Sequence, residues 1–168
     1  MNSIPPVYFF ALGILIFSNS CKKDDTVIIP VFDAVKQASI DDSLLVKYFN
    51  DNKIDSVTKT TTGLYYKITQ PGSDTVRIKK GNTVFVRYKL FFLDSTLVES
   101  NVDAAEAFKF FPGISSVIAA WQEGIPLFKK GEEGDLYLPS GLGYKNVAKG
   151  KVPANTCLRF TLKITNIE

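Results

Sequence analysis

The sequence predicts an α+β fold in which a bent antiparallel sheet of five or six strands wraps one short helix, with a further short helix near the N-terminus. Three observations support this prediction. Residues 158–165 alternate apolar and polar side chains, as a half-buried antiparallel strand does, and residues 83–93 form a second long strand of this kind. The aromatic segment 108–121 breaks at a Pro-Gly pair and continues at helical spacing. This late helix is then the element available to cover the apolar face of the sheet.

The composition narrows the chemistry that the chain can perform. Of the 168 residues, 45% are hydrophobic and 22% charged, and the net charge of +3 is too small to argue for nucleic acid as a partner. The absence of histidine excludes histidine triads, general bases and metal ligands. Two cysteines are too few for thiolate metal clusters. We therefore expect no metal or other cofactor, and any reaction must use carboxylates, hydroxyls, backbone amides or a shaped apolar pocket.

Residues 1–20 have the features of an export signal. They carry no charged side chain, and Val7–Phe17 is apolar apart from one glycine, which is too short to span a bilayer but suits a signal-peptide core. Small residues then precede Cys21, which resembles the cleavage site of a bacterial lipoprotein, where the cysteine is lipidated. We predict a lipoprotein signal peptide over residues 1–20 and a membrane anchor at Cys21. A plain secretory signal with a structural cysteine and a membrane helix are the alternatives. Cys157 should then be a small buried thiol, because its one possible partner is lipidated.

Residues 21–38 are predicted to be a tether. The tract Lys22-Lys23-Asp24-Asp25, basic and then acidic, resembles the export signals of Bacteroidetes-type surface lipoproteins, and a solvated tether explains it equally well. Thr26–Ala38 contains Pro30 and has no clear period, which is typical of a linker.

A helical extension is predicted over residues 39–62, ahead of a domain at residues 63–168. Ser39 to Asp42 looks like a capping box, and the helix should run from about Ile40 to Asp51. Its apolar residues fall at helical spacing: Ile40, Leu44, Leu45, Tyr48 and Phe49. Such a helix is too short to dimerise as a coiled coil, so we expect it to pack on the domain and the chain to be a monomer.

Strands begin from about Gly63, and clusters of Gly, Pro, Asn and Asp separate them. The longest early strand carries Arg87 and Lys89 on the face opposite its apolar and aromatic residues Val84, Val86, Tyr88 and Leu90. The predicted strands are 64–69, 83–93, 97–100, 108–111, 132–138 and 158–165.

The segment 108–121 holds the most prominent candidate for a binding site. Its aromatic strand ends at Pro112-Gly113, and Ser115 and Ser116 could cap a helix that begins near Val117, with the sole tryptophan one turn later. Such a corner could form an aromatic bowl with a tryptophan floor and free backbone N–H groups at one edge. The alternative is an ordinary corner of the core, which composition alone favours because large apolar pockets are few in any protein.

A series of motifs runs from Gly81 to Glu168 with its spacing kept: Gly81, Val84–Tyr88, Phe108–Phe110, Val117–Gly124, Lys130–Glu132, Leu142–Tyr144, Val152–Pro153 and Leu158–Phe160. This series resembles the FKBP-type peptidyl-prolyl cis-trans isomerases. The upstream helix and the segment 63–68 resemble the N-terminal extension of bacterial lipoprotein members. The resemblance implies a bent antiparallel sheet around a short helix, and an isomerase that acts on proline-containing polypeptides in the cell envelope.

The resemblance also implies a prolyl pocket between the sheet and the helix. The backbone N–H of Ile118 and the hydroxyl of Tyr144 would donate hydrogen bonds to the substrate, and Glu99 would act as a hydrogen-bond partner beside Tyr88 rather than as a base. The substrate-binding walls would be Val98, Phe108, Val117, Trp121, Val152 and Phe160.

Four positions depart from the family pattern. Val98 stands where the family has phenylalanine, which would widen the pocket, and Glu99 carries the usual acidic charge on a longer arm. Leu90 and Lys145 replace glycines, so the strand after Tyr88 and the loop that Lys145 begins could run differently. The activity could therefore be reduced, and a binding module or chaperone that uses the same pocket without turnover is the alternative.

Overall fold

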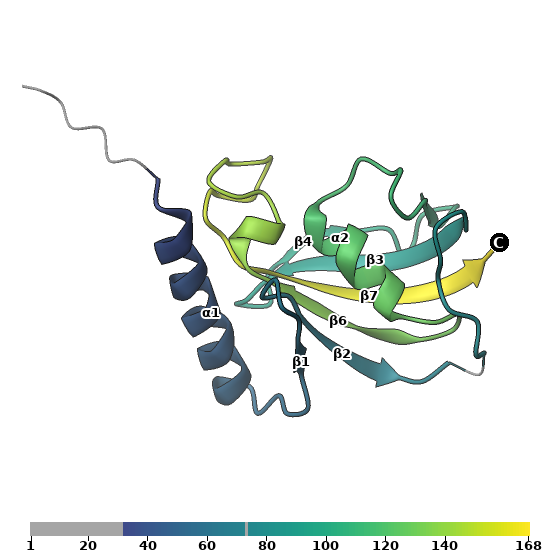
Figure 1. Cartoon of the computed structure of the whole chain (residues 1–168), viewed down its shortest axis with the longest axis horizontal. Coiled ribbons are helices and arrows are strands. Elements are labelled where there is room, and N and C mark those ends of the chain that lie inside the picture. Colours follow the sequence, from purple (N-terminus) through teal and green to yellow (C-terminus); the bar gives the residue numbers. More distant parts are fainter. Residues whose placement is uncertain (1–31, 73) are drawn as a thin grey trace, which may run out of the picture. The chain divides into compact units, whose positions relative to one another are not determined.

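The structure, a computed structural model, describes residues 32–72 and 74–168, and within them the predicted α+β class is confirmed. An antiparallel sheet of seven strands, rather than five or six, has the short helix α2 on one face (Figure 1). The predicted signal peptide, Cys21 and most of the tether lie outside the described residues. In chain order the elements are α1 (Ala34–Asp51), β1 (Thr58–Lys59), β2 (Tyr65–Gln70), β3 (Val84–Phe92), β4 (Leu97–Ser100), β5 (Phe108–Phe110), α2 (Ala119–Gly124), η1 (Ile125–Leu127), β6 (Glu133–Leu138), η2 (Ser140–Leu142) and β7 (Leu158–Ile167).

The sheet is built around β7, which pairs with β6 on one side and with β3 on the other. The strand order is β1-β2-β6-β7-β3-β4, and β5 also pairs with β3. The register of β3 shifts against β7 between Phe85 and Val86, and against β4 between Leu90 and Phe91. Since such irregularities bend and twist a strand, β3 is expected to curve, and β4 and β5, which pair with it, then bend around α2.

Apolar side chains from the sheet and from α2 form the main core. The alternation predicted for β7 is confirmed, because its inward residues are buried: Leu158, Phe160, Leu162 and Ile164. On β3 the buried positions Val84, Val86 and Leu90 continue this face. Trp121 of α2 packs on it and is 4% exposed. The helix therefore covers the sheet as predicted.

The helix α1 begins earlier than the sequence indicated. Oδ1 of Asp33 accepts hydrogen bonds from the backbone N–H groups of Val35 and Lys36, at 3.0 and 2.9 Å, so Asp33 is the N-cap. The predicted capping box at Ser39 is therefore wrong, because Ser39 lies inside the helix. With 18 residues the helix is also longer than predicted, so its length no longer argues against pairing with a second copy.

The buried face of α1 also differs from the predicted one. Ile40 and Leu44 are 43% and 46% exposed, whereas Asp41 is fully buried on the inward face with Leu45. The other inward residues of α1 join a second apolar cluster on the outer side of the sheet, made of Leu45, Tyr48, Phe49, Tyr65, Tyr137 and Cys157. The prediction that this helix packs on the domain is confirmed, as is the buried free thiol of Cys157.

The helix α2 begins at Ala119 and ends at Gly124, where it was predicted to end. The predicted serine cap is wrong, since Ile118 is the N-cap and makes no side-chain cap bond. Ser115 instead braces the preceding loop, because its Oγ accepts from the N–H of Phe111 at 2.9 Å and its carbonyl accepts from Nε2 of Gln122 at 2.6 Å. No helix among the described residues is long and apolar enough to cross a membrane.

Candidate active site

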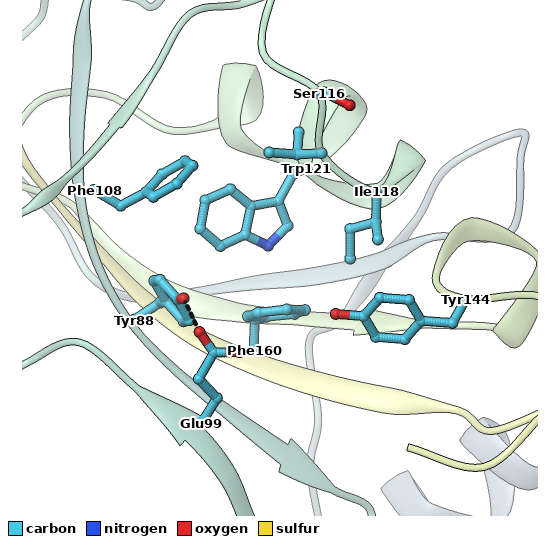
Figure 2. Close-up of a pocket in the computed structure, with 9 residues that line it drawn as sticks. Tyr88, Glu99, Phe108, Ser116, Ile118, Trp121, Tyr144 and Phe160 are labelled. Carbon is cyan, nitrogen blue, oxygen red and sulfur yellow. Dashed lines mark hydrogen bonds between the residues drawn. The ribbon is translucent and has the colours of Figure 1, made fainter. Parts of the chain in front are cut away.

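A cavity of about 400 Å³ lies between α2 and the sheet (Figure 2). Its lining residues come from six separate parts of the chain: Tyr88, Glu99, Phe108, Ser116, Val117, Ile118, Trp121, Tyr144 and Phe160. Every one of them except Ser116 belongs to the predicted site. Sequence reasoning assigned Ser116 to a helix cap, and its position directly before Val117 was the one signal that could have placed it here.

Trp121 forms the floor of the cavity, surrounded by aromatic rings that meet it edge-on (Figure 2). The ring centroids of Tyr88, Phe108 and Phe160 lie 5.0, 5.3 and 5.4 Å from that of Trp121, with interplanar angles of 87°, 85° and 74°. Edge-to-face contacts of this kind are the favoured geometry for aromatic pairs and hold the rings in place. The corner at residues 108–121 is therefore an aromatic bowl and not simply a filled part of the core.

Tyr88 and Glu99 form one polar wall of the cavity, from the neighbouring strands β3 and β4. The Tyr88 hydroxyl donates a 2.6 Å hydrogen bond to Oε1 of Glu99 (Figure 2). Burial, together with this bond and the negative charge of Glu99, raises the pKa of Tyr88 well above its usual value. Asn101 fixes the Tyr88 backbone, because its Oδ1 accepts from Tyr88 N–H at 2.7 Å. Glu99 therefore holds the neutral phenol of Tyr88 in place, and the hydrogen bond expected between these two residues is present.

Among the described residues, Nε1 of Trp121 in the floor of the cavity has no hydrogen-bond partner. Two further donors that lack partners there belong to Tyr144 and Ile118, which also line the cavity. One is the hydroxyl of Tyr144, which points into the cavity toward Phe160 (Figure 2). Burial first, and then the negative charge of Glu99, raises the pKa of Tyr144, so its hydroxyl keeps its proton at neutral pH. The other is the backbone N–H of Ile118, which precedes the first turn of α2 and makes no backbone bond there. The residues that line the cavity thus carry unpartnered donors at separate points of the site.

Val98 and Val152 lie outside this cavity, although they were predicted to form its walls. They line an adjoining cavity of about 340 Å³ together with Leu90, Lys149, Gly150 and Lys151, and the two cavities share Glu99 and Tyr144. The branched side chain of Val98 packs against the core but is shorter than the phenylalanine of the family pattern. The main cavity therefore lacks the phenylalanine wall of the family pattern at position 98.

A cavity with an aromatic floor and unpartnered hydrogen-bond donors on its lining residues is suited to bind a small apolar group and to orient it by hydrogen bonds. The sequence profile of the FKBP-type peptidyl-prolyl cis-trans isomerases matches residues 74–165 of this chain. The chain belongs to this family.

Similar proteins include bacterial and eukaryotic members. A probable FKBP-type peptidyl-prolyl cis-trans isomerase FkpA from Neisseria meningitidis is 37% identical over 114 residues, which are 67% of this chain and 41% of that protein. FK506-binding protein 2 of Dictyostelium discoideum is 31% identical over 110 residues, 65% of this chain and 80% of that protein. The crystal structure of FkpA from Escherichia coli matches with a TM-score of 0.66 at 26% identity, over 80% of this chain and 62% of that one. The chain spans about half or less of the FkpA proteins that it matches in sequence.

Proposed function

We propose that this protein is a peptidyl-prolyl cis-trans isomerase that acts on proline-containing polypeptides. The observation that supports this most directly is the cavity of about 400 Å³ around Trp121, because it combines an apolar floor for a prolyl ring with the unpartnered donors of Ile118 and Tyr144. Glu99 and Tyr88 serve as an orienting pair and not as a base, since the Tyr88 hydroxyl already donates to Oε1 of Glu99.

The reaction requires no covalent intermediate. Rotation about an X-Pro bond has a barrier of ~18–20 kcal/mol because the amide loses its resonance as it twists. A dry aromatic pocket disfavours the more polar planar amide relative to the twisted one. The N–H of Ile118 and the hydroxyl of Tyr144 hold the carbonyl groups that flank the rotating bond, which supplies orientation and preorganised electrostatics. This chemistry suits a chain with no histidine.

We further propose that the protein works in the cell envelope as a lipid-anchored monomer, in the manner of Bacteroidetes-type surface lipoproteins. The uncharged segment 1–20 and the small residues before Cys21 support a lipoprotein signal and a lipid anchor. A short tether would then lead to α1 and the isomerase domain at residues 63–168. The burial of Tyr48 and Phe49 against the same chain supports a monomer. The modest net charge of +3 argues against nucleic acid as a partner.

The enzymatic proposal is tested by the rate at which a cis-prolyl peptide converts in the presence of the full-length protein. We expect acceleration over the uncatalysed reaction, which takes tens to hundreds of seconds. Tyr144→Phe should slow turnover while leaving the circular dichroism spectrum unchanged. A protein with a folded spectrum that produces no acceleration would refute the catalytic proposal. The anchor is tested separately by incorporation of labelled fatty acid, which Cys21→Ser should abolish.

One observation favours a second candidate function, a proline-peptide-binding module or chaperone without useful turnover. The main cavity adjoins a second cavity that Val98 lines, so a bound prolyl ring would lack the phenylalanine wall of the family pattern there. The two functions differ in a simple comparison. A binding module quenches or shifts the fluorescence of Trp121 when a proline peptide is added but does not change the isomerisation rate, whereas an enzyme does both.

A further inference from the structure

Asp41 of α1 is a fully buried carboxylate that lies upstream of the part of the chain matched by the family profile. Burying an ionised carboxylate is costly unless hydrogen bonds satisfy its oxygens. Both oxygens have partners. Oδ2 accepts from the backbone N–H of Ser140 at 2.8 Å and from its Oγ at 2.6 Å, and Oδ1 accepts from Nε2 of Gln37 at 2.7 Å. The carboxylate therefore joins α1 to the first residue of η2.

Ser140 in turn organises the loop that carries Tyr144. The carbonyl oxygen of Ser140 accepts from the N–H of Gly143 at 3.0 Å and from the N–H of Lys145 at 2.8 Å. These two bonds lie on either side of Tyr144 in the sequence, so they set the backbone from which its side chain projects. Lys145 has a φ of 60°, in the left-handed region that costs a non-glycine residue energy, so the turn needs such support.

We propose that Asp41 is a positioning residue for the active site, acting through Ser140 on the hydroxyl of Tyr144. The inference rests on the proposed isomerase function, in which Tyr144 donates to the substrate. Asp41 is itself held firmly, because the neighbouring turn of α1 is buried through Leu45, and the thiol of Cys157 donates to the Asp41 carbonyl oxygen at 3.8 Å. The helix α1, which precedes the family domain, then helps to position the Tyr144 hydroxyl in the active site.

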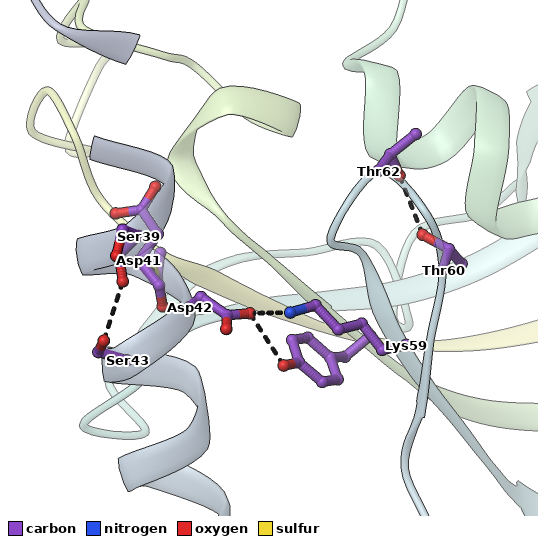
Figure 3. Close-up of polar contacts among 9 residues, drawn as sticks. Ser39, Asp41, Asp42, Ser43, Lys59, Thr60 and Thr62 are labelled. Atoms are coloured by element: carbon purple, nitrogen blue, oxygen red, sulfur yellow. Dashed lines mark hydrogen bonds and ion pairs between the residues drawn. The ribbon is translucent and has the colours of Figure 1, made fainter. Parts of the chain in front are cut away.

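The chain supplies a matched control in the next residue. Asp42 accepts from the hydroxyl of Tyr65 at 2.9 Å and pairs with Lys59, at the edge of the sheet that β1 forms (Figure 3). It makes no hydrogen bond to the loop at residues 139–146. Replacing Asp42 removes a carboxylate from the same helix without touching the connection to Tyr144.

The test is a double-mutant cycle on the full-length protein, with kcat/KM for a cis-prolyl peptide as the readout. We expect Asp41→Asn to lower kcat/KM about tenfold when Tyr144 is present, but less than about twofold in a Tyr144→Phe background. Ser140→Ala removes one of the two donors that Ser140 offers to Asp41, with less risk to folding, and should show the same dependence on Tyr144. Asp42→Asn should change kcat/KM less than about twofold in either background. If Asp41→Asn lowers kcat/KM by the same factor with and without the Tyr144 hydroxyl, Asp41 only stabilises the fold, and the proposal is overturned.

A second readout does not depend on activity. Hydrogen exchange followed by NMR should show the amide protons of Gly143 and Lys145 exchanging about tenfold faster in Asp41→Asn, and unchanged in Asp42→Asn. Unchanged exchange in Asp41→Asn would also overturn the proposal. If the wild-type protein does not turn over peptides, the proposed function fails. In that case the same double-mutant cycle is measured with the affinity for a proline peptide, followed by Trp121 fluorescence, in place of kcat/KM. Losses of affinity that simply add would likewise overturn the proposal.

Discussion

The hydroxyl of Tyr88 lies 2.6 Å from Oε1 of Glu99 and donates to it, so that β3 and β4 are joined by a side-chain bond at the wall of the cavity. The phenol ring of Tyr88 meets the indole of Trp121 edge-on, with centroids 5.0 Å apart. One hydrogen bond thereby sets the angle of a ring that a bound proline would touch.

Removing this bond should impair the site modestly. Glu99→Ala is expected to lower kcat/KM by about 3- to 10-fold, because the Tyr88 ring loses its anchor. Tyr88→Phe should cost about the same, and the double variant should be no worse than either single one. Glu99 is exposed, so the melting temperature should hardly change. A loss of about a thousandfold, or a break in the pH–rate profile near the pKa of a carboxylate, would instead identify Glu99 as a base.

Restoring the aromatic wall should improve the enzyme. Val98→Phe would extend a ring toward the boundary between the main cavity and the one beside it. We expect kcat/KM to rise about tenfold, mainly through tighter binding, since the additional ring removes apolar surface of a bound proline from water. Val98→Leu, which is larger than valine but not aromatic, should give a smaller gain and serves as the control. No change in Val98→Phe would mean that the natural site is already complete.

The close approach of α2 to the sheet depends on Gly124. A Cβ atom at this position would lie 2.6 Å from Cδ1 and 2.9 Å from Cδ2 of Leu136 on β6. Gly124→Ala should therefore destabilise the protein by about 1–3 kcal/mol and shift α2 with its tryptophan. Gly141→Ala is the matched control, because nothing lies within 4 Å of its added Cβ. Thermal unfolding of both variants decides the point, and equal melting temperatures would contradict this account of the packing.

The stability of the protein should fall at alkaline pH through Cys157. Burial, and then the negative charge of Asp41, raises the pKa of this thiol from 9.0 to about 12. Because the unfolded chain releases the proton first, the contribution is complete below about pH 9 and is lost as the pH rises toward about 12. We expect the free energy of unfolding, measured with urea, to fall between about pH 8 and about pH 10.5 in both proteins. The fall should be about 2 kcal/mol smaller in Cys157→Ala than in the wild type. The tyrosines with raised pKa values act in the same direction in both proteins and cancel in this comparison. Equal losses would mean that the thiol does not titrate differently on folding.

Most of the sheet could be predicted from the sequence because the longer strands have a recognisable local pattern of apolar residues. In β7 every second residue from Leu158 to Ile164 is apolar, and burial on one face requires that alternation. The two-residue strand β1 has no such pattern, since both Thr58 and Lys59 are exposed, and it was missed. The pairing of β1 with β2 depends on backbone contacts between the two strands and not on burial of the side chains of β1.

The errors around α1 and the cavity have one physical cause, namely contacts between residues far apart in the sequence. Asp41 turns inward because Ser140 offers it two donors, and no pattern within the helix shows this. Apolar spacing, which is all that the sequence displays there, predicts an inward Ile40, whereas this side chain is 43% exposed. In the same way, the family resemblance identified Val98 as a wall, but the reach of a side chain decides which cavity it lines.

The central place of β7 also sets the order in which the protein can become active. Among the described strands, only β7 joins the half of the sheet formed by β1, β2 and β6 to the half formed by β3, β4 and β5. Tyr88 and Phe108 belong to the second half, and Phe160 arrives with β7 itself. A chain made from its N-terminus therefore cannot join the two halves of this sheet until residues 158–167 have been synthesised. The cavity around Trp121 is therefore incomplete until β7 has been made, because Phe160 is one of its lining residues.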